Sequence, residues 1–396
     1  MLSSLALRKK SLINSPWVSS IGRGLNVMDY KNKRRILIAT GIFPPDIGGP
    51  ATYSALLEKE LTTRGFTVNI ASFSSVRKWP RLIRHSIFFL RVIKRACSAD
   101  TVFAQDPVSV GFPAYCAARL CRRRFVLKVV GDYAWEQYAL AHPHNFPTIE
   151  DFQHLSLGGI TLLRRTIERF VARHADAVVV PSMFLKKIIL SWGVSAERVH
   201  VIYNAANLPD RENHDPLLSI PEGEPLLMSA GREVPWKGFD QIIDSLTLLE
   251  KKFPRVKLLL IGDGPDRRRL QEKVREHKVE HLVVFLGNLE RETLFRYLSS
   301  ADIFILNTLY EGFPHQILEV MHLGVPIITT DVGGIRELVD ERSVCFVKPK
   351  NTEALVKAVI SVLGESSMRT ERIANAKKRA ASFTSRDMIT SLLPLL

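Results

Sequence analysis

The sequence predicts an α/β protein with two doubly wound, Rossmann-like domains that face each other across a cleft. Short apolar runs such as RILIAT (35–40) and TVFAQ (101–105) alternate with longer helix-like segments, the order typical of parallel sheets wrapped by helices. The alternation begins again at PLLMSA (225–230), after a polar stretch with three prolines (203–224). A length of 396 residues suits two domains better than one.

The first domain is expected over residues 35–202. A helix over 51–64 should stop at Gly65, and a basic amphipathic helix is expected over 80–97. The predicted strands of this domain are 35–40, 67–73, 101–105, 125–130 and 177–182.

The second domain is expected over residues 225–382, after a linker at 203–224. A C-terminal helix within 383–396 is expected to pack back toward the first domain. The predicted strands of the second domain are 225–230, 256–262, 282–287, 302–307 and 325–330.

Residues 1–34 show no clear periodicity, are rich in Ser and basic residues, and contain no acidic residue before Asp29. This composition fits a disordered tail, a start codon assigned too early ahead of Met28, or a transit peptide. We expect a disordered or wrongly assigned tail.

The overall composition, 46% hydrophobic and 24% charged, is typical of a soluble globular protein with a full core. No apolar run reaches the roughly 18 residues needed to span a bilayer. The four cysteines have no metal-ligand spacing, so we expect small, buried, free thiols in a reducing compartment. They are Cys97, Cys116, Cys121 and Cys345.

The positive charge lies in the first half of the chain. Residues 1–205 carry 29 Lys and Arg against 13 Asp and Glu, whereas residues 206–396 carry 26 against 27. Such asymmetry favours an anionic partner: a membrane, a nucleic acid or a phosphorylated substrate. The stretch 77–96 holds seven Lys and Arg, no acidic residue and many apolar residues, which fits a helix on an anionic membrane and equally an ordinary crossover helix. No nucleic-acid-binding module is recognisable, so no nucleic acid is expected as a partner.

Ligands of doubly wound sheets bind beyond the carboxyl ends of the strands, so the loops there are the candidate sites. After the first strand, Gly48 and Gly49 precede a helix whose N-terminus could face an anion, although a plain tight turn fits as well. After the first strand of the second domain, Arg232 and Lys237 lie five residues apart and could hold a diphosphate. Gly262, in IGDGP (261–265), could let a base or ribose approach the backbone or could serve a simple turn.

Two glutamates eight residues apart, Glu311 and Glu319, flank the start of a predicted helix. Pro314 suits the first helical position and Gly324 the end. Glu319 then lies roughly 7.5 Å along the helix axis from its start, too far to share a proton with Glu311 as a tight pair. The two carboxylates could instead contact separate diols of one extended ligand, such as a nucleotide sugar, while the helix N-terminus faces its phosphates.

These elements, taken in order, resemble the retaining GT-B glycosyltransferases of family 4. The resemblance covers about residues 35–385 and is strongest over ADIFILNTLYEGFPHQILEVMHLGVPIITTDVGGIRELV (301–339), with the two glutamates, the Gly-x-Pro strand entry and the Gly-Gly-x-x-Glu loop. It implies transfer of a hexose-type sugar from a nucleotide diphosphate sugar, with retention of configuration, to a glycan or lipid-linked acceptor. It further implies a cytoplasmic enzyme of cell-envelope polysaccharide synthesis, peripheral on the inner face of the membrane.

The resemblance also implies roles for individual residues. Arg232 and Lys237 would hold the diphosphate, Glu311 would contact the donor sugar, and Glu319 would contact the ribose. The remaining donor contacts would come from the backbone, at Gly48, Gly49, Gly262, Phe313, His315 and Gln316.

Two departures from the family pattern concern the first domain and the linker. Many relatives carry a histidine near the sugar where this chain has Gly131 followed by Asp132, so Asp132 is a candidate to take over the sugar contact. The segment YNAAN (203–207) differs from the common Pro-Asn-Gly, and no role is expected for it. The catalytic candidates are therefore Glu311, Asp132, Arg232 and Lys237.

No cofactor and no metal ion are expected, because the chain contains no Asp-x-Asp to bridge a metal to a diphosphate. Cationic side chains and helix dipoles would carry the leaving-group charge instead. A nucleotide-sugar epimerase of the same fold remains an alternative, as does a basic, non-catalytic binding protein.

Overall fold

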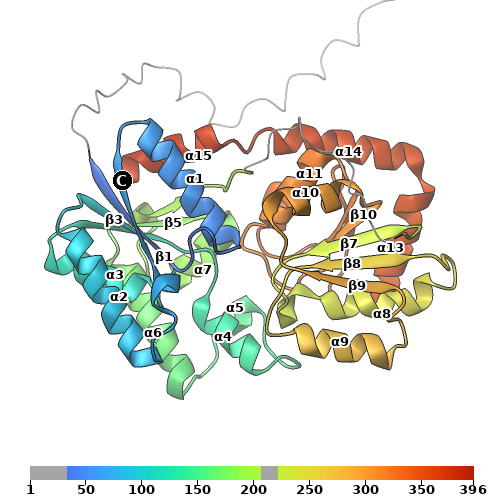
Figure 1. Cartoon of the computed structure of the whole chain (residues 1–396), viewed down its shortest axis with the longest axis horizontal. Coiled ribbons are helices and arrows are strands. Elements are labelled where there is room, and N and C mark those ends of the chain that lie inside the picture. The colour runs from blue at the N-terminus through green and yellow to red at the C-terminus, as the bar shows by residue number, and fades with distance from the viewer. Residues whose placement is uncertain (1–33, 207–221) are drawn as a thin grey trace, which may run out of the picture.

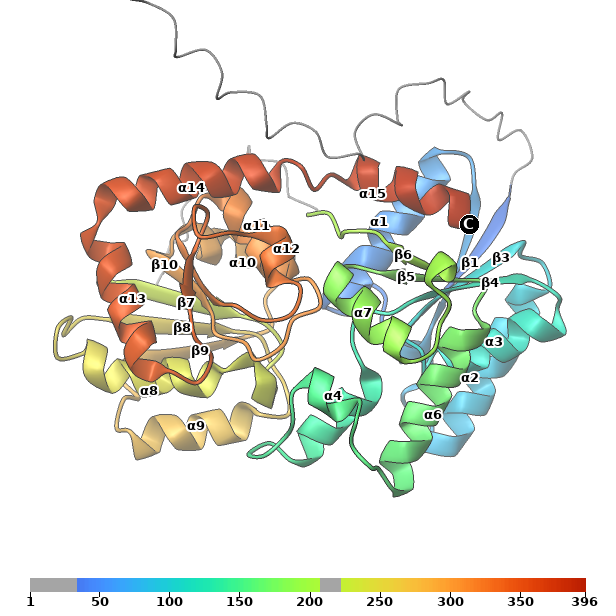
Figure 2. The same cartoon turned by 180° about the vertical axis from the view of Figure 1, so that it is seen from behind.

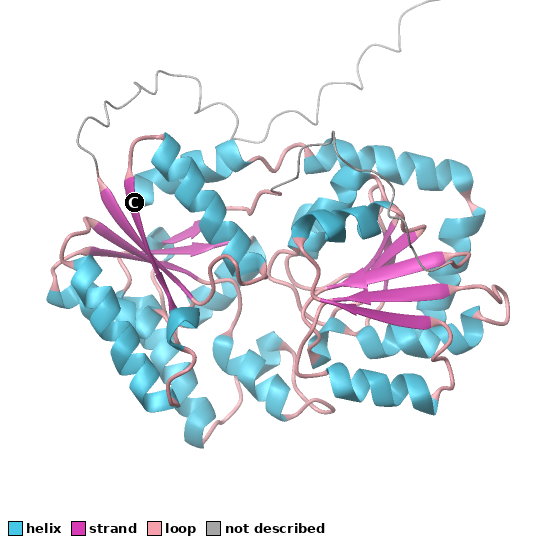
Figure 3. Ribbon diagram, in the orientation of Figure 1, coloured by secondary structure: helices cyan, strands magenta, loops and turns pink. Residues whose placement is uncertain are grey.

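The computed structural model describes residues 34–206 and 222–396, which form two α/β domains lying side by side (Figure 1). The expectations for residues 1–33 and for the linker between 207 and 221 lie outside the described residues. Each domain is built around a parallel six-stranded sheet with helices on both faces (Figure 3). The predicted fold class, two doubly wound Rossmann-like domains, is confirmed.

The first sheet has the strand order β2-β1-β3-β4-β5-β6. Its strands are β1 (Arg35–Thr40), β2 (Thr67–Ser72), β3 (Thr101–Gln105), β4 (Arg124–Lys128), β5 (Ala177–Val180) and β6 (Val199–Val201). The helices of this domain are α1 (Gly49–Thr63), α2 (Arg81–Ala96), α3 (Gly111–Leu120), α4 (Tyr133–Ala141), α5 (Ile149–Phe152), α6 (Gly159–His174) and α7 (Met183–Ser191).

The second sheet has the strand order β12-β11-β10-β7-β8-β9. Its strands are β7 (Leu226–Ala230), β8 (Lys257–Ile261), β9 (Val283–Gly287), β10 (Ile303–Leu306), β11 (Ile327–Thr330) and β12 (Cys345–Val347). The helices that follow β7 are α8 (Phe239–Leu249), α9 (Arg267–Glu276), α10 (Arg291–Ser299), α11 (His315–Leu323), α12 (Ile335–Leu338), α13 (Thr352–Gly364), α14 (Ser366–Ala380) and α15 (Ser385–Leu392).

Successive side chains of each strand point to opposite faces of the sheet, as strand geometry requires. In β1, Ile36 and Ile38 pack with α1 and α15, whereas Leu37 and Ala39 pack with α2 and α3. In β7, Leu227 packs toward α8 and α13. The inner strands of each sheet are therefore buried on both sides, which is why they read as continuous apolar runs in the sequence.

β6 belongs to the first domain and β7 to the second, and the chain returns to the first domain after α14 (Figure 2). α14 packs on the core of the second domain through Ala376 and Ala380. α15 packs on the first sheet, and its Met388 and Ile389 are buried against the strands there. The C-terminal segment thus covers one face of the first sheet.

Two sequence expectations need correction, and two strands were not predicted. Cys97 and Cys121 form a disulfide, so they are not free thiols; Cys116 and Cys345 are free and half-buried. The reason is topological: consecutive crossover helices of a parallel sheet run in the same direction, so the residues that follow α2 and α3 meet. Pro314 caps α11 from outside instead of occupying its first position. The short strands β6 and β12 were not predicted.

Candidate functional site

The candidate site lies where the order of the second sheet reverses, between β7 and β10. The chain leaves β7 toward α8 on one face of the sheet and leaves β10 toward α11 on the other face. Loops that diverge in this way open a crevice at the carboxyl ends of the two strands, the usual ligand position in such folds. The loop after β7 carries Arg232 and Lys237, and the loop after β10 carries Glu311.

Lys237 and Glu311 form an ion pair between these two loops, and each side chain is only 12% exposed. The Gln316 side chain lies nearby: its amide nitrogen is 3.7 Å from the point that a Cβ atom at Gly231 would occupy, and Lys237 Nζ is 3.9 Å from that point. The structure therefore brings together three of the predicted donor-binding residues.

The loop that carries Glu311 is held from two sides. The Leu309 amide donates to the Trp236 carbonyl at 2.7 Å, which ties the two strand-end loops together. The Gly334 amide donates to the Glu311 carbonyl at 2.9 Å. A Cβ atom at Gly333 would lie 2.1 Å from that carbonyl oxygen, so only glycine fits there. The Gly-Gly pair of the family motif thus sets the position of the Glu311 backbone.

Arg232 is the open cation of the site. Its side chain is exposed and has no hydrogen bond or ion pair with any residue in the described part of the chain. Lys237, by contrast, is occupied by Glu311. An incoming diphosphate would thus meet one free guanidinium and one ammonium that is already shared with a carboxylate.

Helix α11 begins at this point without a side-chain cap, so backbone N–H groups of its first turn remain available to an anion. His315, the first residue, is half-buried beside Lys128, Arg291 and Lys237. Burial and these cations lower the pKa of His315 to about 3, so its imidazole is neutral at physiological pH. The predicted phosphate-facing backbone therefore lies among positive charges.

Glu319 lies on α11, away from the Lys237–Glu311 pair. It is 8% exposed and accepts from Arg291 Nη2 at 3.1 Å. Burial raises the pKa of Glu319, and the nearby guanidinium partly opposes that effect. Phe313, whose backbone was also predicted to contact the donor, packs its ring against Tyr203 and Phe383.

The predicted glycines have different surroundings. Gly48, with φ of 148°, precedes α1, and a Cβ atom there would lie 2.9 Å from Ile42 Cδ1. Gly49 has open space around it and begins α1, whose N-terminus has no side-chain cap. Gly262 packs against the neighbouring loop, because a Cβ atom there would lie 2.0 Å from the Gly231 carbonyl oxygen. Gly262 therefore supports the backbone that presents Arg232.

Asp132 is buried in a structural network. It caps α4 by accepting from the Trp135 amide at 2.8 Å, and its other oxygen accepts from Gln153 Nε2 at 2.8 Å. It is 1% exposed, and burial raises its pKa. Glu136, four residues further on, presents the carboxylate that faces the second domain from this region, and it was not predicted from the sequence.

Contacts between the domains involve further residues that were not predicted from the sequence. Trp135 lies 5.3 Å from Trp236 and 5.0 Å from Tyr310 between ring centroids, so the first domain's core continues into the second. Glu337, the glutamate of the Gly-Gly-x-x-Glu loop, accepts from the amides of Met183 and Phe184 at 2.7 and 2.8 Å, at the start of α7. The first turn of a helix in one domain is thus bound by a carboxylate of the other.

Two residues of the segment for which no role was expected, Tyr203 and Asn204, make contacts with distant parts of the chain. The Tyr203 hydroxyl donates to Glu337 at 3.1 Å. Asn204 accepts from Lys128 Nζ at 2.7 Å, and that ammonium lies 3.1 Å from the centroid of the Tyr53 ring. Burial places the pKa of Lys128 well below its usual value. No sequence pattern pointed to these pairs, because each joins distant parts of the chain.

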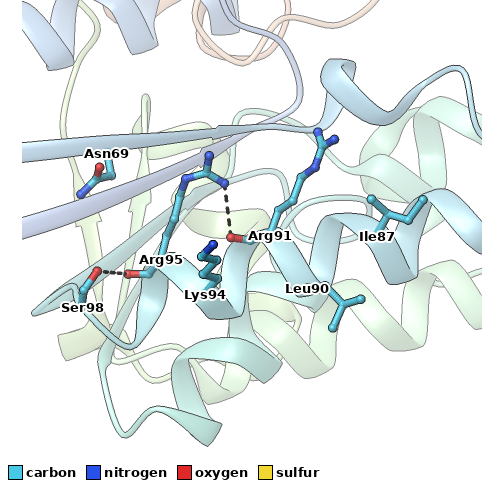
Figure 4. A pocket seen from close by; sticks show the side chains of 7 residues that line it. All are labelled: Asn69, Ile87, Leu90, Arg91, Lys94, Arg95 and Ser98. Atoms are coloured by element: carbon cyan, nitrogen blue, oxygen red, sulfur yellow. Dashed lines mark hydrogen bonds between the residues drawn. The ribbon is translucent and has the colours of Figure 1, made fainter.

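Other kinds of site find little support in residues 34–206 and 222–396. These ranges contain no group of three or more His, Cys, Asp or Glu placed to hold a metal ion. None of their helices is long and apolar enough to cross a membrane. A pocket does occur on the far side of the first domain, along α2 (Figure 4). Its lining residues are Asn69, Ile87, Leu90, Arg91, Lys94, Arg95 and Ser98.

Two facing Rossmann-like domains, with cations and an uncapped helix at the switch point of the second, define an enzyme of the GT-B glycosyltransferase class. Comparison with known proteins agrees: residues 210–379 match the family described as Glycosyl transferases group 1, and residues 47–209 match Glycosyltransferase Family 4. The chain belongs to the family 4 glycosyltransferases.

Individual relatives are distant. An uncharacterised glycosyltransferase of Methanocaldococcus jannaschii is 29% identical over 51% of this chain and 54% of its own length. A putative teichuronic acid biosynthesis glycosyltransferase of Bacillus subtilis is 32% identical over 36% of this chain and 34% of its own. The chain thus spans about half the length, or less, of these curated relatives. The crystal structure of Anabaena HepE in complex with UDP and glucose superposes with a TM-score of 0.69 at 18% identity, covering 92% of this chain and 100% of the other. That likeness confirms the fold.

Proposed function

We propose that the protein is a retaining hexosyltransferase that uses a nucleotide diphosphate sugar as donor and a glycan or lipid-linked molecule as acceptor. The observation that carries the proposal is the meeting of Lys237, Glu311 and Gln316 at the switch point, beside the free Arg232 and the uncapped N-terminus of α11. This arrangement offers cations and N–H groups for two phosphates and a carboxylate for sugar hydroxyls. The solved relative with bound UDP and glucose supports this choice of donor class.

In the proposed reaction, the bond between the anomeric carbon and the diphosphate oxygen breaks and the sugar passes through an oxocarbenium-like state. Arg232, Lys237 and the start of α11 stabilise the charge that develops on the departing diphosphate. Glu311 orients the sugar, and Glu319 binds the ribose hydroxyls. The acceptor attacks from the leaving-group face and gives its proton to the departing phosphate, so no side-chain base and no metal ion is required.

Transfer to an acceptor distinguishes this proposal from the epimerase alternative. A panel of nucleotide sugars is first screened for thermal stabilisation of the protein, since a ligand of the native state raises the melting temperature. The best donor is then incubated with candidate acceptors, and the anomeric configuration of the product is read by NMR. Retention, with activity unaffected by a chelator, is expected. An inverted product would refute the retaining assignment, and isomerisation of the donor without any acceptor would favour the epimerase. Absence of both reactions would favour a binding protein.

We further propose that the first domain binds an anionic membrane surface through α2, on the cytoplasmic side, where a lipid-linked acceptor of envelope polysaccharide synthesis would lie. Exposed cations on this helix, Arg91, Lys94 and Arg95, stand beside the exposed Ile83 and Leu90. α3 packs against α2 and adds further exposed apolar side chains, at Phe112 and Leu120. Each Lys or Arg near such a surface contributes about 1 kcal/mol.

Liposome flotation tests this surface. The protein should float with anionic vesicles at low salt, remain unbound with neutral vesicles, and be released at high salt because exposed charges are screened. Replacing Arg91, Lys94 and Arg95 with Gln should abolish flotation. Equal recovery with neutral and anionic vesicles, or flotation that survives the triple replacement, would exclude the membrane proposal and favour a soluble acceptor.

A further inference from the structure

Glu136 is an unpartnered carboxylate at the junction of the two domains. It lies in the first turn of α4, which Asp132 caps, and it is half-buried. Across residues 34–206 and 222–396 its carboxylate makes no hydrogen bond and no ion pair. Buried carboxylates are normally hydrogen-bonded. Within the described part of the chain the carboxylate of Glu136 is not, so it can still accept hydrogen bonds from a ligand.

The position of this carboxylate is set by Gly131. Glu136 Oε1 lies 2.6 Å from the point that a Cβ atom at position 131 would occupy, and the Tyr310 hydroxyl lies 3.3 Å from the same point. Any side chain at position 131 would therefore displace Glu136. Because Gly131 has no side chain, the Glu136 carboxylate can lie beside the end of β4 and next to Tyr310, a residue of the loop that carries Glu311.

The charges around Glu136 come from both domains. Arg232 and Lys237, on the second domain, lower its pKa, whereas Asp132 and Asp106, on the first, raise it. Burial outweighs these effects and raises the pKa of Glu136 to about 7. Arg232 and Lys237, the two cations assigned to the diphosphate, therefore act electrostatically on the Glu136 carboxylate, but neither forms an ion pair with it.

We propose that Glu136 binds a hydroxyl group of the donor sugar from the first domain, on the opposite side from Glu311. The inference rests on the proposed function, because it places the sugar beside a diphosphate held by Arg232 and Lys237. A carboxylate that lies near two cations without contacting either is well placed for the uncharged, hydroxyl-rich group that follows the phosphates. Asp132 then acts as a positioning residue: both its oxygens are occupied, and its cap fixes the helix turn that presents Glu136.

A different account is that Glu136 only attracts the second domain electrostatically and helps to hold the domains together. The two accounts differ in what they predict for ligands. A sugar-binding carboxylate affects the affinity for a nucleotide sugar but not for the matching nucleoside diphosphate, which lacks the sugar. A purely structural charge affects both ligands alike, or neither.

Titration calorimetry with UDP-glucose and UDP tests the proposal; if the wild-type protein prefers another donor of the panel, the corresponding sugar and diphosphate pair is used. Glu136→Gln and Glu136→Ala should weaken binding of the nucleotide sugar about tenfold to a hundredfold, the range for loss of a hydrogen bond to a charged group. Binding of the diphosphate should stay within about twofold of the wild type. Gly131→Ala keeps the carboxylate but displaces it, so it should weaken sugar binding in the same selective way.

The matched control is Glu150→Gln, which removes an exposed carboxylate from α5 in the same domain and should change neither affinity. Equal losses for both ligands, or no loss for either, in folded Glu136 variants would overturn the assignment of Glu136 alone. If the wild-type protein bound no nucleotide sugar of the panel and no nucleoside diphosphate, the proposed function would fall, and the assignment of Glu136 with it.

Discussion

Glu337 binds the two domains together, and its removal should loosen their junction measurably. Its carboxylate accepts from the Met183 and Phe184 amides at 2.7 and 2.8 Å and from the Tyr203 hydroxyl at 3.1 Å. A hydrogen bond to a charged group contributes about 1.5–3 kcal/mol, and an anion at a helix N-terminus about 0.3–1 kcal/mol. Glu337 is half-buried, so water partly replaces these contacts and the lower end of the ranges applies. We expect Glu337→Ala to cost about 2 kcal/mol of domain association, which counts one net hydrogen bond (about 1.5 kcal/mol) and the charge at the helix N-terminus (about 0.3 kcal/mol), because water replaces the remaining contacts in the variant.

Hydrogen exchange at the two amides is the direct assay. A cost of about 2 kcal/mol corresponds to a roughly 30-fold shift in a local opening equilibrium, so the Met183 and Phe184 amides should exchange about 30 times faster in Glu337→Ala. Glu337→Gln keeps the shape but not the charge, and it should fall between the variant and the wild type.

Glu341→Ala is the control, because Glu341 is an exposed carboxylate that pairs with Arg336 in its own domain. It should leave exchange at residues 183 and 184 unchanged. Wild-type exchange at both amides in Glu337→Ala, or an equal acceleration in the control, would refute the reasoning that this carboxylate links the domains.

Three further predictions concern the site itself. Arg232→Ala and Lys237→Ala should each lower kcat/KM by about two to three orders of magnitude with an unchanged circular dichroism spectrum, the range for loss of one group that stabilises developing charge; wild-type kinetics in both would contradict the diphosphate assignment. Glu319→Ala should raise the KM for the donor more than it lowers kcat, because the ribose is remote from the reacting carbon; the reverse pattern would place Glu319 elsewhere. The pKa of His315 is about 3 in the folded protein against 6.5 ordinarily, so its contribution to stability is present above pH 6.5 and is lost as the pH falls toward 3. The melting temperature of the wild type should therefore fall relative to that of His315→Gln between pH 7 and pH 4, and parallel curves for the two proteins would argue against a buried neutral imidazole.

The sequence predicted those parts of the fold and site that depend on local pattern. Apolar runs separated by amphipathic helices indicated parallel sheets, because strands buried on both faces have no polar side. The rule that ligands lie at carboxyl strand ends then drew attention to Arg232, Lys237 and Glu311, which the structure places on the loops that follow the neighbouring strands β7 and β10.

Features that depend on how distant segments pack were not predictable in this way. The Cys97–Cys121 disulfide requires that the ends of α2 and α3 meet. Glu136 approaches Arg232 only because the two domains face each other. One local signal for Glu136 did exist: a capping Asp132 four residues earlier predicts a helix turn at a strand end, where a first-turn glutamate would face the ligand side.

The double crossing of the chain limits how the domains can move against each other. A single connection would permit bending and twisting in any direction. The chain passes between the domains at two places, between β6 and β7 and between α14 and α15, so any relative motion of the domains must keep both connections intact. The hydrogen bonds between Glu337 and the start of α7 would have to break for the domains to separate. Such a separation would also move Glu136, on the first domain, away from Arg232, on the second.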